Sequence, residues 1–150
     1  MFRGASALSL DDKGRLGIPA KFRDALAERC NGQVVLTVNY RERCLWLYPM
    51  DEWDIVEKKV AELPSFDPTA QELKRFLIGY ADDCELDTAG RVRVSAPLRE
   101  FAELGKRIVL LGQRNKFEIW DEALWNRRRD EWLRQPQERE LPIELESISL

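Results

Sequence analysis

The stretch LDDKGRLGIPAKFR at residues 10–23 returns in related form as LDTAGRVRVSAPLR at residues 86–99. Because the two copies begin at residues 10 and 86, they lie 76 residues apart. The identical positions include Asp11 and Asp87, Gly14 and Gly90, Arg15 and Arg91, Ala20 and Ala96, and Arg23 and Arg99. A repeat of this length indicates a duplicated supersecondary unit, so the chain consists of two related halves.

Both copies carry the pattern Asp-x-x-Gly-Arg between two apolar segments. An aspartate side chain accepts hydrogen bonds from backbone amides just ahead of it and thereby starts a turn. Glycine supplies a positive φ that other residues reach only with strain. We therefore predict a β-hairpin in each copy, with an arginine beside its turn. The turn-structuring residues are Asp11, Gly14, Asp87 and Gly90.

Two roles are open to the arginines that follow these turns, Arg15 and Arg91. One motif of this kind is an ordinary hairpin whose arginine is solvated, because such turn chemistry is common. The presence of a second copy with matching downstream residues favours a shared function for the two arginines.

Length and composition describe a globular protein. The chain has 150 residues, of which 44% are hydrophobic and 34% charged, enough for one domain or two small ones. It contains no histidine, which removes the commonest general base and metal ligand. Cys30, Cys44 and Cys84 fit neither a disulfide framework nor a metal pattern, so we expect buried thiols in a reducing cytosol. No apolar run is long enough for a membrane, and no signal-peptide pattern is present.

Positive charge gathers in the first repeat, although the chain as a whole is acidic. The net charge is −3, whereas residues 1–50 hold eight Lys or Arg against five Asp or Glu. The basic residues near the first turn are Arg3, Lys13, Arg15, Lys21 and Arg23. A local basic patch can attract DNA phosphates even on an acidic protein. A solvated charged face gives the same pattern.

Apolar periodicity and turn residues predict a similar order of elements in both halves. In the first half we expect strands at residues 2–10, 16–18, 33–38 and 44–48, and helices at 20–30 and from Pro49 to Pro64. Thr69 and Glu72 form a capping-box pattern that predicts a further helix. In the second half, strands at 108–110 and 117–120 precede a helix capped by Asp121. The predicted domains are a first repeat at residues 1–63, a linker and helix at 64–76, a second repeat at 77–136 and a tail at 137–150.

The tryptophans allow two interpretations. Aromatic side chains interleaved with basic residues can stack nucleic-acid bases. Trp46, Trp53, Trp120, Trp125 and Trp132, however, lie in apolar strand or helix patterns. Because a buried tryptophan removes a large area from water, packing in the core or between subunits is the favoured interpretation.

A cluster of acidic residues ahead of the second turn raises the alternative of an enzyme. Asp82, Asp83, Glu85 and Asp87 could hold a divalent metal through oxygen ligands. A solvated acidic strand is favoured, because no nucleophile–base pair or glycine-rich phosphate loop accompanies them. We therefore predict a protein that is not an enzyme and that has no catalytic residue, metal site or cofactor.

The two motif copies resemble the MraZ family of bacterial regulators, as do MFRGA at the start, CLWLYPMDEWD at residues 44–54 and VLLGQRNKFEIWD at residues 109–121. The resemblance covers essentially the whole chain. It implies an α+β fold in which two tandem AbrB-like (SpoVT-AbrB) repeats, each a swapped hairpin, interlock into one small β-barrel with flanking helices. It also implies ring-shaped homo-oligomers that bind double-stranded DNA at direct repeats in the promoter of the division and cell-wall gene cluster. The implied location is cytoplasmic and nucleoid-associated, without a membrane.

The resemblance assigns the family's functional arginines to Arg15 and Arg91 and its motif aspartates to Asp11 and Asp87. By charge and proximity, we add further DNA-binding candidates. These are Arg3, Lys13, Lys21, Arg23, Arg93 and Arg99.

The two repeats are not equally basic. The second copy has Ala89 and Pro97 where the first has Lys13 and Lys21. We therefore expect the first repeat to contribute more to DNA contact. The competing hypothesis is a ring-forming assembly protein without DNA readout, whose arginines only make salt bridges between subunits. An electrophoretic shift assay separates the two hypotheses.

Overall fold

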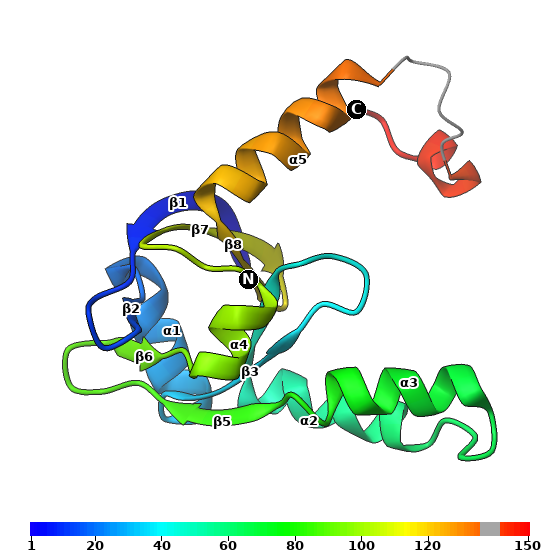
Figure 1. Cartoon of the computed structure of the whole chain (residues 1–150), viewed down its shortest axis with the longest axis horizontal. Helices are drawn as coiled ribbons and strands as arrows, with labels where there is room; N and C mark the ends of the chain where they lie inside the picture. Colours follow the sequence, from blue (N-terminus) through cyan, green and yellow to red (C-terminus); the bar gives the residue numbers. More distant parts are fainter. Residues whose placement is uncertain (136–141) are drawn as a thin grey trace.

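The computed structural model describes residues 1–135 and 142–150 (Figure 1). The first half contains β1 (Phe2–Ser9), β2 (Arg15–Gly17), α1 (Ala20–Cys30), β3 (Gln33–Val38), β4 (Leu45–Pro49) and α2 (Met50–Ala61). The second half contains α3 (Pro68–Leu77), β5 (Asp82–Glu85), β6 (Arg91–Arg93), α4 (Ala96–Phe101), β7 (Arg107–Arg114), β8 (Phe117–Asp121) and α5 (Glu122–Arg134). A 3-10 helix, η1 (Ile143–Ser147), follows near the C-terminus. The predicted α+β class is confirmed.

Strands of both halves intermix in one antiparallel sheet. Its order is β1-β7-β8-β4-β3-β5, and a second sheet pairs β2 with β6. The counterparts in the two halves are β1 and β5, β3 and β7, and β4 and β8. When each strand is replaced by its counterpart, the same order is obtained, read from the other edge of the sheet. The first strand of each half therefore pairs with the third strand of the other half, as β1 does with β7 and β5 with β3. The two repeats interlock through these pairings.

This pairing corrects the hairpin that the motif residues predict. β1 and β2 flank the first turn, but a single bridge between Leu10 and Leu16 connects them. β2 pairs instead with β6, its counterpart from the second half. No pairing joins the edge strands β1 and β5 within the described residues. Closure of the sheet into a barrel therefore stays a prediction.

The core is built jointly by both halves. Leu16 and Ile18 from the first half, and Val92 and Val94 from the second, are completely buried in one cluster. Phe2, Phe22 and Phe117 also meet there, with ring centroids 4.3–5.7 Å apart. Each half supplies strands that the other half needs to cover its apolar side chains, so the halves form one folding unit.

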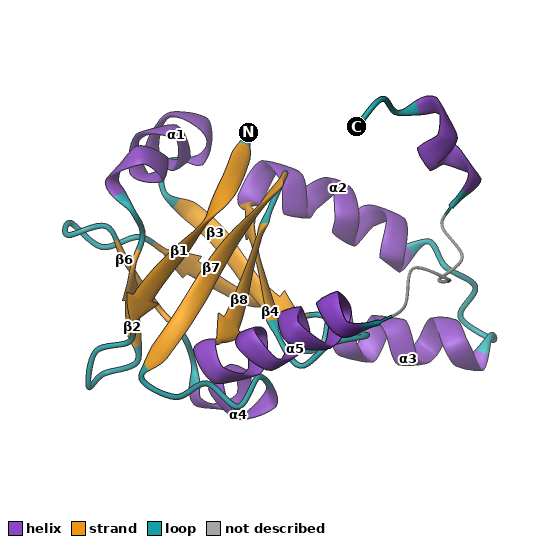
Figure 2. Ribbon diagram, turned by 90° about the horizontal axis from the view of Figure 1, so that it is seen from above, coloured by secondary structure: helices purple, strands orange, loops and turns teal. Residues whose placement is uncertain are grey.

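Helices surround the sheet, and α3 and α5 extend beyond it (Figure 1). Figure 2 shows α1, α2 and α4 around the strands. Figure 1 shows that α3 lies beside α2 and that α5 projects away from the sheet after β8. The start of α3 differs from the predicted capping box, because Asp67 rather than Thr69 is the N-cap residue and accepts a hydrogen bond from the Thr69 amide. Asp121 caps α5 as predicted. In the described part of the chain, no helix has the length and apolar character to cross a membrane.

The tryptophans and cysteines differ in burial. Trp53 and Trp120 are buried, Trp46 and Trp125 are half-buried, and Trp132 is half exposed. The packing interpretation therefore holds for Trp53 and Trp120, whereas Trp132 shows its ring at the surface. All three cysteines are free thiols; Cys44 is buried as expected, but Cys30 and Cys84 are only half-buried. The predicted boundary between second repeat and tail, at residues 136 and 137, lies outside the described residues.

Candidate nucleic-acid interface

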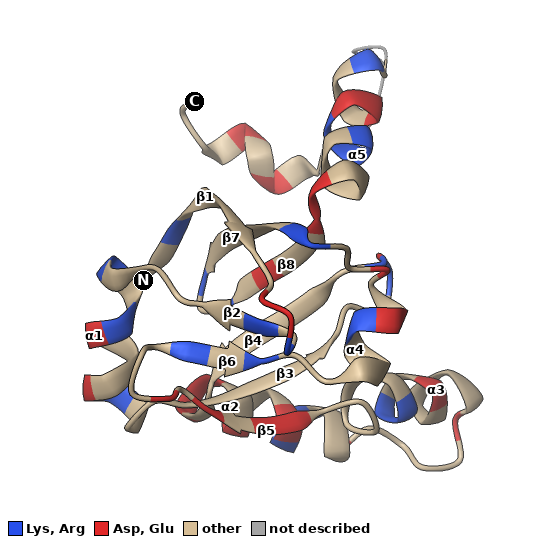
Figure 3. Cartoon of the chain, turned by 60° about the vertical axis from the view of Figure 1, so that its left-hand side comes forward, with Lys and Arg blue, Asp and Glu red and all other residues tan. Residues whose placement is uncertain are grey.

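The outer face of the β2–β6 sheet is a two-stranded ribbon of arginines. Leu16 and Val92 are paired in register and point inward, where both are fully buried. Alternation along each strand therefore turns their neighbours outward. Arg15 lies directly opposite Arg93, and Gly17 lies opposite Arg91. Figure 3 shows the basic segments of β2 and β6 side by side.

Each turn fixes its motif arginine in the same way. Asp11 Oδ1 accepts hydrogen bonds from the amides of Lys13 and Arg15 at 2.9 and 2.8 Å, and its Oδ2 accepts from Arg15 Nε at 2.7 Å. In the second turn, Asp87 accepts from the amides of Ala89 and Arg91 and from Arg91 Nε, each at 2.9 Å. The aspartates therefore shape the turns and also orient the guanidinium groups.

The orientation leaves part of each guanidinium available. In both motif ion pairs, the bond runs from Nε to the carboxylate. Among the described residues, the two terminal nitrogens, Nη1 and Nη2, of Arg15 and of Arg91 donate no hydrogen bond. The side chains are 28% and 37% exposed, respectively. Two free nitrogens in a plane can donate in parallel to a phosphate or to a guanine edge.

Like charges face each other across the ribbon. Arg15 and Arg93 are directly opposed, and such a pair destabilises an antiparallel sheet. Within the part of the chain that the structure describes, Arg93 forms no ion pair, and it is exposed. An anion lying across both strands would relieve this repulsion. The ribbon therefore has the electrostatic character of a binding surface for phosphates.

Arg23 and Arg99 have contacts that the sequence does not suggest. Arg23 Nε donates to the carbonyl of Ile18, and Arg99 Nη1 donates to that of Val94. Each guanidinium lies over the turn glycine of the other half. Arg23 covers Gly90, and Arg99 covers Gly14. Both arginines are half-buried. They pack against the turn of the other half, while their hydrogen bonds stay within their own half, and their predicted contact with DNA stays a prediction.

The remaining candidates occupy two places. Lys13 lies in the first turn, next to the ribbon, and is exposed. Arg3 lies at the opposite end of β1 from that turn. Lys21 is close to Gly4, because a Cβ at that glycine would be 3.6 Å from the lysine Nζ. Arg3 and Lys21 therefore gather at the start of β1 rather than beside the first turn.

Sequence reasoning missed a basic pair beside the first turn. The carbonyl of Lys106 accepts a hydrogen bond from the Leu10 amide at 2.8 Å, and Arg107 pairs in register with Ser9. The corresponding place beside the second turn is Gly32, whose carbonyl accepts from the Leu86 amide. The interlocked pairing thus adds positive charge to the first turn alone, and no local pattern in the sequence could have shown it.

The turn carboxylates are held in their charged form. Hydrogen bonds from the backbone amides of Arg15 and Arg91 are the main cause that lowers the pKa of Asp11 and Asp87, respectively, below the ordinary 3.8. A carboxylate whose folded pKa is lowered stabilises the fold above its unfolded pKa and loses that effect as the pH falls through the folded value.

We expect the double variant Asp11→Ala/Asp87→Ala to melt a few degrees below the parent protein at pH 7, because two turns lose their acceptors. The difference should shrink as the pH falls below about 3.8, because the carboxyls then gain protons first in the unfolded chain and, at still lower pH, in the folded parent protein. Thermal melts over a pH series measure this. Asp11→Asn/Asp87→Asn is the matched control, since its amide oxygen still accepts from the backbone. A difference that does not vary with pH would contradict the role of the charged form.

Acidic residues also approach the ribbon. Asp82, Asp83 and Glu85 of β5 line a small cavity with Arg93. No group of three or more His, Cys, Asp or Glu side chains that could hold a metal occurs among residues 1–135 and 142–150. The acidic strand is thus a negatively charged neighbour of the β6 side of the ribbon, and this further distinguishes the second repeat from the first.

Comparison with known proteins identifies relatives along the whole chain. The model of the MraZ protein family matches twice, at residues 1–76 and at residues 77–141. The transcriptional regulator MraZ of Halorhodospira halophila is 52% identical over 152 residues, covering all of both chains. That of Alkalilimnicola ehrlichii is 45% identical over 150 residues, again with complete coverage of both. That of Idiomarina loihiensis is 53% identical over 126 residues, covering 84% of this chain and 83% of the relative.

Proposed function

Because the chain belongs to the MraZ family, we propose that it regulates transcription by binding double-stranded DNA through the outer face of the β2–β6 ribbon. Its relatives are named transcriptional regulators, and the chain is a regulator of this kind and not an enzyme. The observation that carries the proposal is the register of the ribbon, which sets Arg15 directly opposite Arg93.

The shape of the ribbon suits the major groove of DNA. A two-stranded antiparallel ribbon fits into that groove, where base edges can be read. The buried inner face, with Leu16 and Val92, holds the ribbon rigidly against the core. Arg15, oriented by Asp11, is the candidate for a bidentate contact with guanine. Lys13 and Lys106 would contact phosphates and set the register.

One protomer offers few basic side chains, so it should bind weakly by itself. In the proposal, a ring of protomers displays the same ribbon several times. Promoter boxes repeated at a fixed spacing then engage neighbouring protomers, and the effective concentration multiplies the affinity. The boxes proposed are those upstream of the division and cell-wall gene cluster, and the site of action is the nucleoid in the cytoplasm. Closure of the interlocked sheet into a small barrel belongs to the same proposal.

A gel-shift titration tests this function. We expect the full-length protein to bind DNA from upstream of its own gene about 10³-fold more tightly than a shuffled fragment of equal length. The logarithm of the binding constant should fall linearly with the logarithm of the salt concentration, because phosphate contacts release counterions. Sedimentation of the same sample gives the oligomer size. An assembled protein that binds both fragments equally, or binds neither, would favour the structural assembly protein instead.

A further inference from the structure

Each motif turn is hydrogen-bonded to a strand end of the other half. The amide of Val94, directly after β6, donates to the carbonyl of Gly14 at 2.8 Å. The amide of Ile18, directly after β2, donates to the carbonyl of Gly90 at 2.9 Å. Ile18 and Val94 are completely buried, so neither moves without disturbing the shared core. The position of each turn therefore depends on a buried residue of the opposite half.

The same two buried residues also bind an arginine. The carbonyl of Ile18 accepts a hydrogen bond from Arg23 Nε, and that of Val94 accepts one from Arg99 Nη1. Arg23 is the fourth residue of α1, and Arg99 is the fourth residue of α4. Because side chains of an α-helix point toward its N-terminus, both guanidinium groups reach back to the strand ends. One side chain in each half therefore joins the helix start to the strand end.

Each arginine also covers the turn that its own bonded residue holds. The guanidinium of Arg99 lies against Gly14, and that of Arg23 lies against Gly90. Since each turn glycine has a positive φ and lacks a Cβ, the guanidinium can approach its backbone closely. The opposite half therefore restrains each turn twice, by a bond to the glycine carbonyl and by a side chain packed on the glycine.

A continuous series of contacts leads from Arg99 to Arg15. Behind the covered Gly14, the amide of this glycine donates to the carbonyl of Asp11 at 2.9 Å. The carboxylate of Asp11 accepts from Arg15 Nε and orients the guanidinium on the ribbon. A shift of the glycine would therefore change the direction of the motif arginine. The second turn has the same contacts through Gly90, Asp87 and Arg91.

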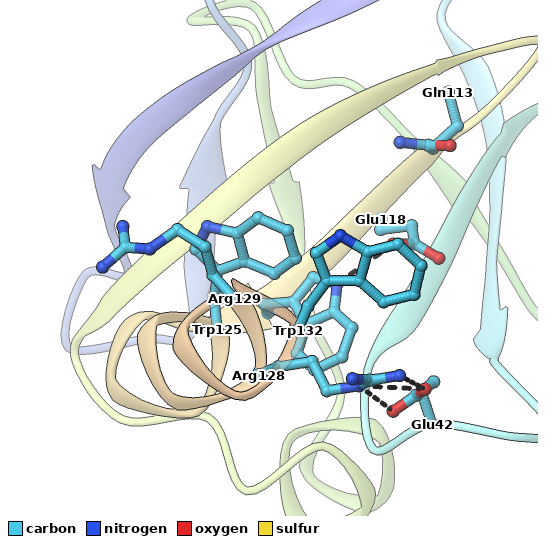
Figure 4. Close-up of a pocket in the computed structure, with 8 residues that line it drawn as sticks. Glu42, Gln113, Glu118, Trp125, Arg128, Arg129 and Trp132 are labelled. Carbon is cyan, nitrogen blue, oxygen red and sulfur yellow. Dashed lines mark hydrogen bonds and ion pairs between the residues drawn. The ribbon is translucent and has the colours of Figure 1, made fainter. Parts of the chain in front are cut away.

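The contacts of these two arginines differ from those of an arginine held by a carboxylate. Arg128 of α5, for example, donates from Nε and Nη2 to Glu42 Oε1 at 3.2 and 3.1 Å (Figure 4). In the described part of the chain, no carboxylate pairs with Arg23 or Arg99. Their described hydrogen bonds go to backbone carbonyls. What they fix is therefore the backbone of the strand ends and of the turns.

We propose that Arg99 positions the first turn, and with it Arg15, for contact with DNA. Arg23 positions the second turn, and with it Arg91, in the same way. The inference rests on the proposed function, because it takes the two motif arginines as the groups that meet DNA. It makes each DNA-contacting turn dependent on the opposite half of the chain. Direct contact of Arg23 and Arg99 with phosphates is the competing outcome of the test.

Hydrogen exchange of the full-length protein without DNA tests the crossed arrangement. We expect Arg23→Ala to speed the exchange of the second-turn amides about fivefold or more, while the first turn stays as in the parent. Arg99→Ala should have the reverse effect. Faster exchange at both turns, at neither turn, or only at the turn of the same half would overturn the inference. The amides to be followed by peptide-resolved mass spectrometry are those of Lys13 and Arg15 and those of Ala89 and Arg91.

Arg23→Gln is the matched conservative variant. The amide nitrogen of glutamine lies as many bonds from Cα as Arg23 Nε, so it can still donate to the Ile18 carbonyl, but it has no charge. A positioning residue needs the donor, so this variant should recover most of the slow exchange and DNA binding that Arg23→Ala loses. A phosphate contact needs the charge. Failure to recover, with a salt dependence flattened by about one unit per contact, would overturn the inference.

A double-variant series connects the exchange pattern with DNA binding. Added to Arg91→Ala, Arg23→Ala should weaken binding by less than about twofold, because the arginine that it positions is already absent. Arg99→Ala in the same background should keep its whole effect of about tenfold, since it acts on Arg15. Full effects of both additions would identify direct DNA contacts and overturn the inference. A parent protein that binds no DNA would contradict the proposed function, whereas the exchange pattern would still decide the crossed arrangement.

Discussion

Replacing Arg15 by alanine should abolish detectable binding to the promoter fragment while the oligomer stays assembled. The variant removes the guanidinium that Asp11 orients on the outer face of the ribbon. Loss of one base or phosphate contact costs roughly 1–3 kcal/mol per protomer. Since a ring repeats the loss at every engaged protomer, two engaged copies together lose roughly 2–6 kcal/mol, which weakens binding by about thirtyfold or more.

The matched variant Arg91→Ala should weaken binding less. Both arginines have the same bonds to their aspartates, but the charges around them differ. Lys13 lies in the first turn, and the β1–β7 pairing brings Lys106 next to that turn. In the second turn the corresponding places are Ala89 and Gly32, and β5 adds negative charge nearby. DNA phosphates should therefore be attracted more strongly to the first turn.

The comparison requires both variants in one salt series on one DNA fragment. Removing one phosphate contact per engaged protomer should flatten the salt dependence by about one unit per contact. Arg75→Ala is a suitable control, because Arg75 pairs with Glu72 on the exposed surface of α3. Equal losses from Arg15→Ala and Arg91→Ala would show that both turns contact DNA equally. Undiminished binding by assembled Arg15→Ala would exclude this ribbon as the contact surface.

Replacing either turn glycine by alanine should strongly destabilise the fold. Gly14 and Gly90 both have a φ of 73°, a conformation that costs an L-residue about 1–2 kcal/mol. A Cβ at Gly14 would also overlap the guanidinium of Arg99, and one at Gly90 that of Arg23. Each substitution therefore displaces the arginine of the other half that packs over the turn. We expect a loss of about 2 kcal/mol or more per site.

Gly17→Ala is the matched control for these variants. Gly17 lies on the same ribbon, has no positive φ, and a Cβ there would meet nothing within 4 Å. Urea unfolding of Gly14→Ala, Gly90→Ala and Gly17→Ala measures the free energies of unfolding. If all three variants unfold at the same urea concentration, the turn geometry and the covering arginines do not stabilise the fold as argued.

The sequence by itself determined the local structure. The turns form at Asp11 and Asp87 because each aspartate bonds amides two and four residues ahead, and these bonds need no distant partner. Helix α1 spans Ala20–Cys30 as its apolar pattern predicts, and a left-handed Asn31 ends it, followed by Gly32. The duplication also showed that the two halves have the same supersecondary structure, because identical residues recur at a fixed spacing.

Only the tertiary structure decided which strands pair. A strand offers the same backbone groups to a neighbour in sequence or to one from the other half, so the motif alone predicts a hairpin. The interlocked arrangement buries Leu16 against Val92, one from each half. This strand pairing places Arg15 opposite Arg93 and brings Lys106 to the first turn. The charge of the candidate site therefore depends on residues about 80 to 95 positions apart, which come together because both halves must cover one shared core.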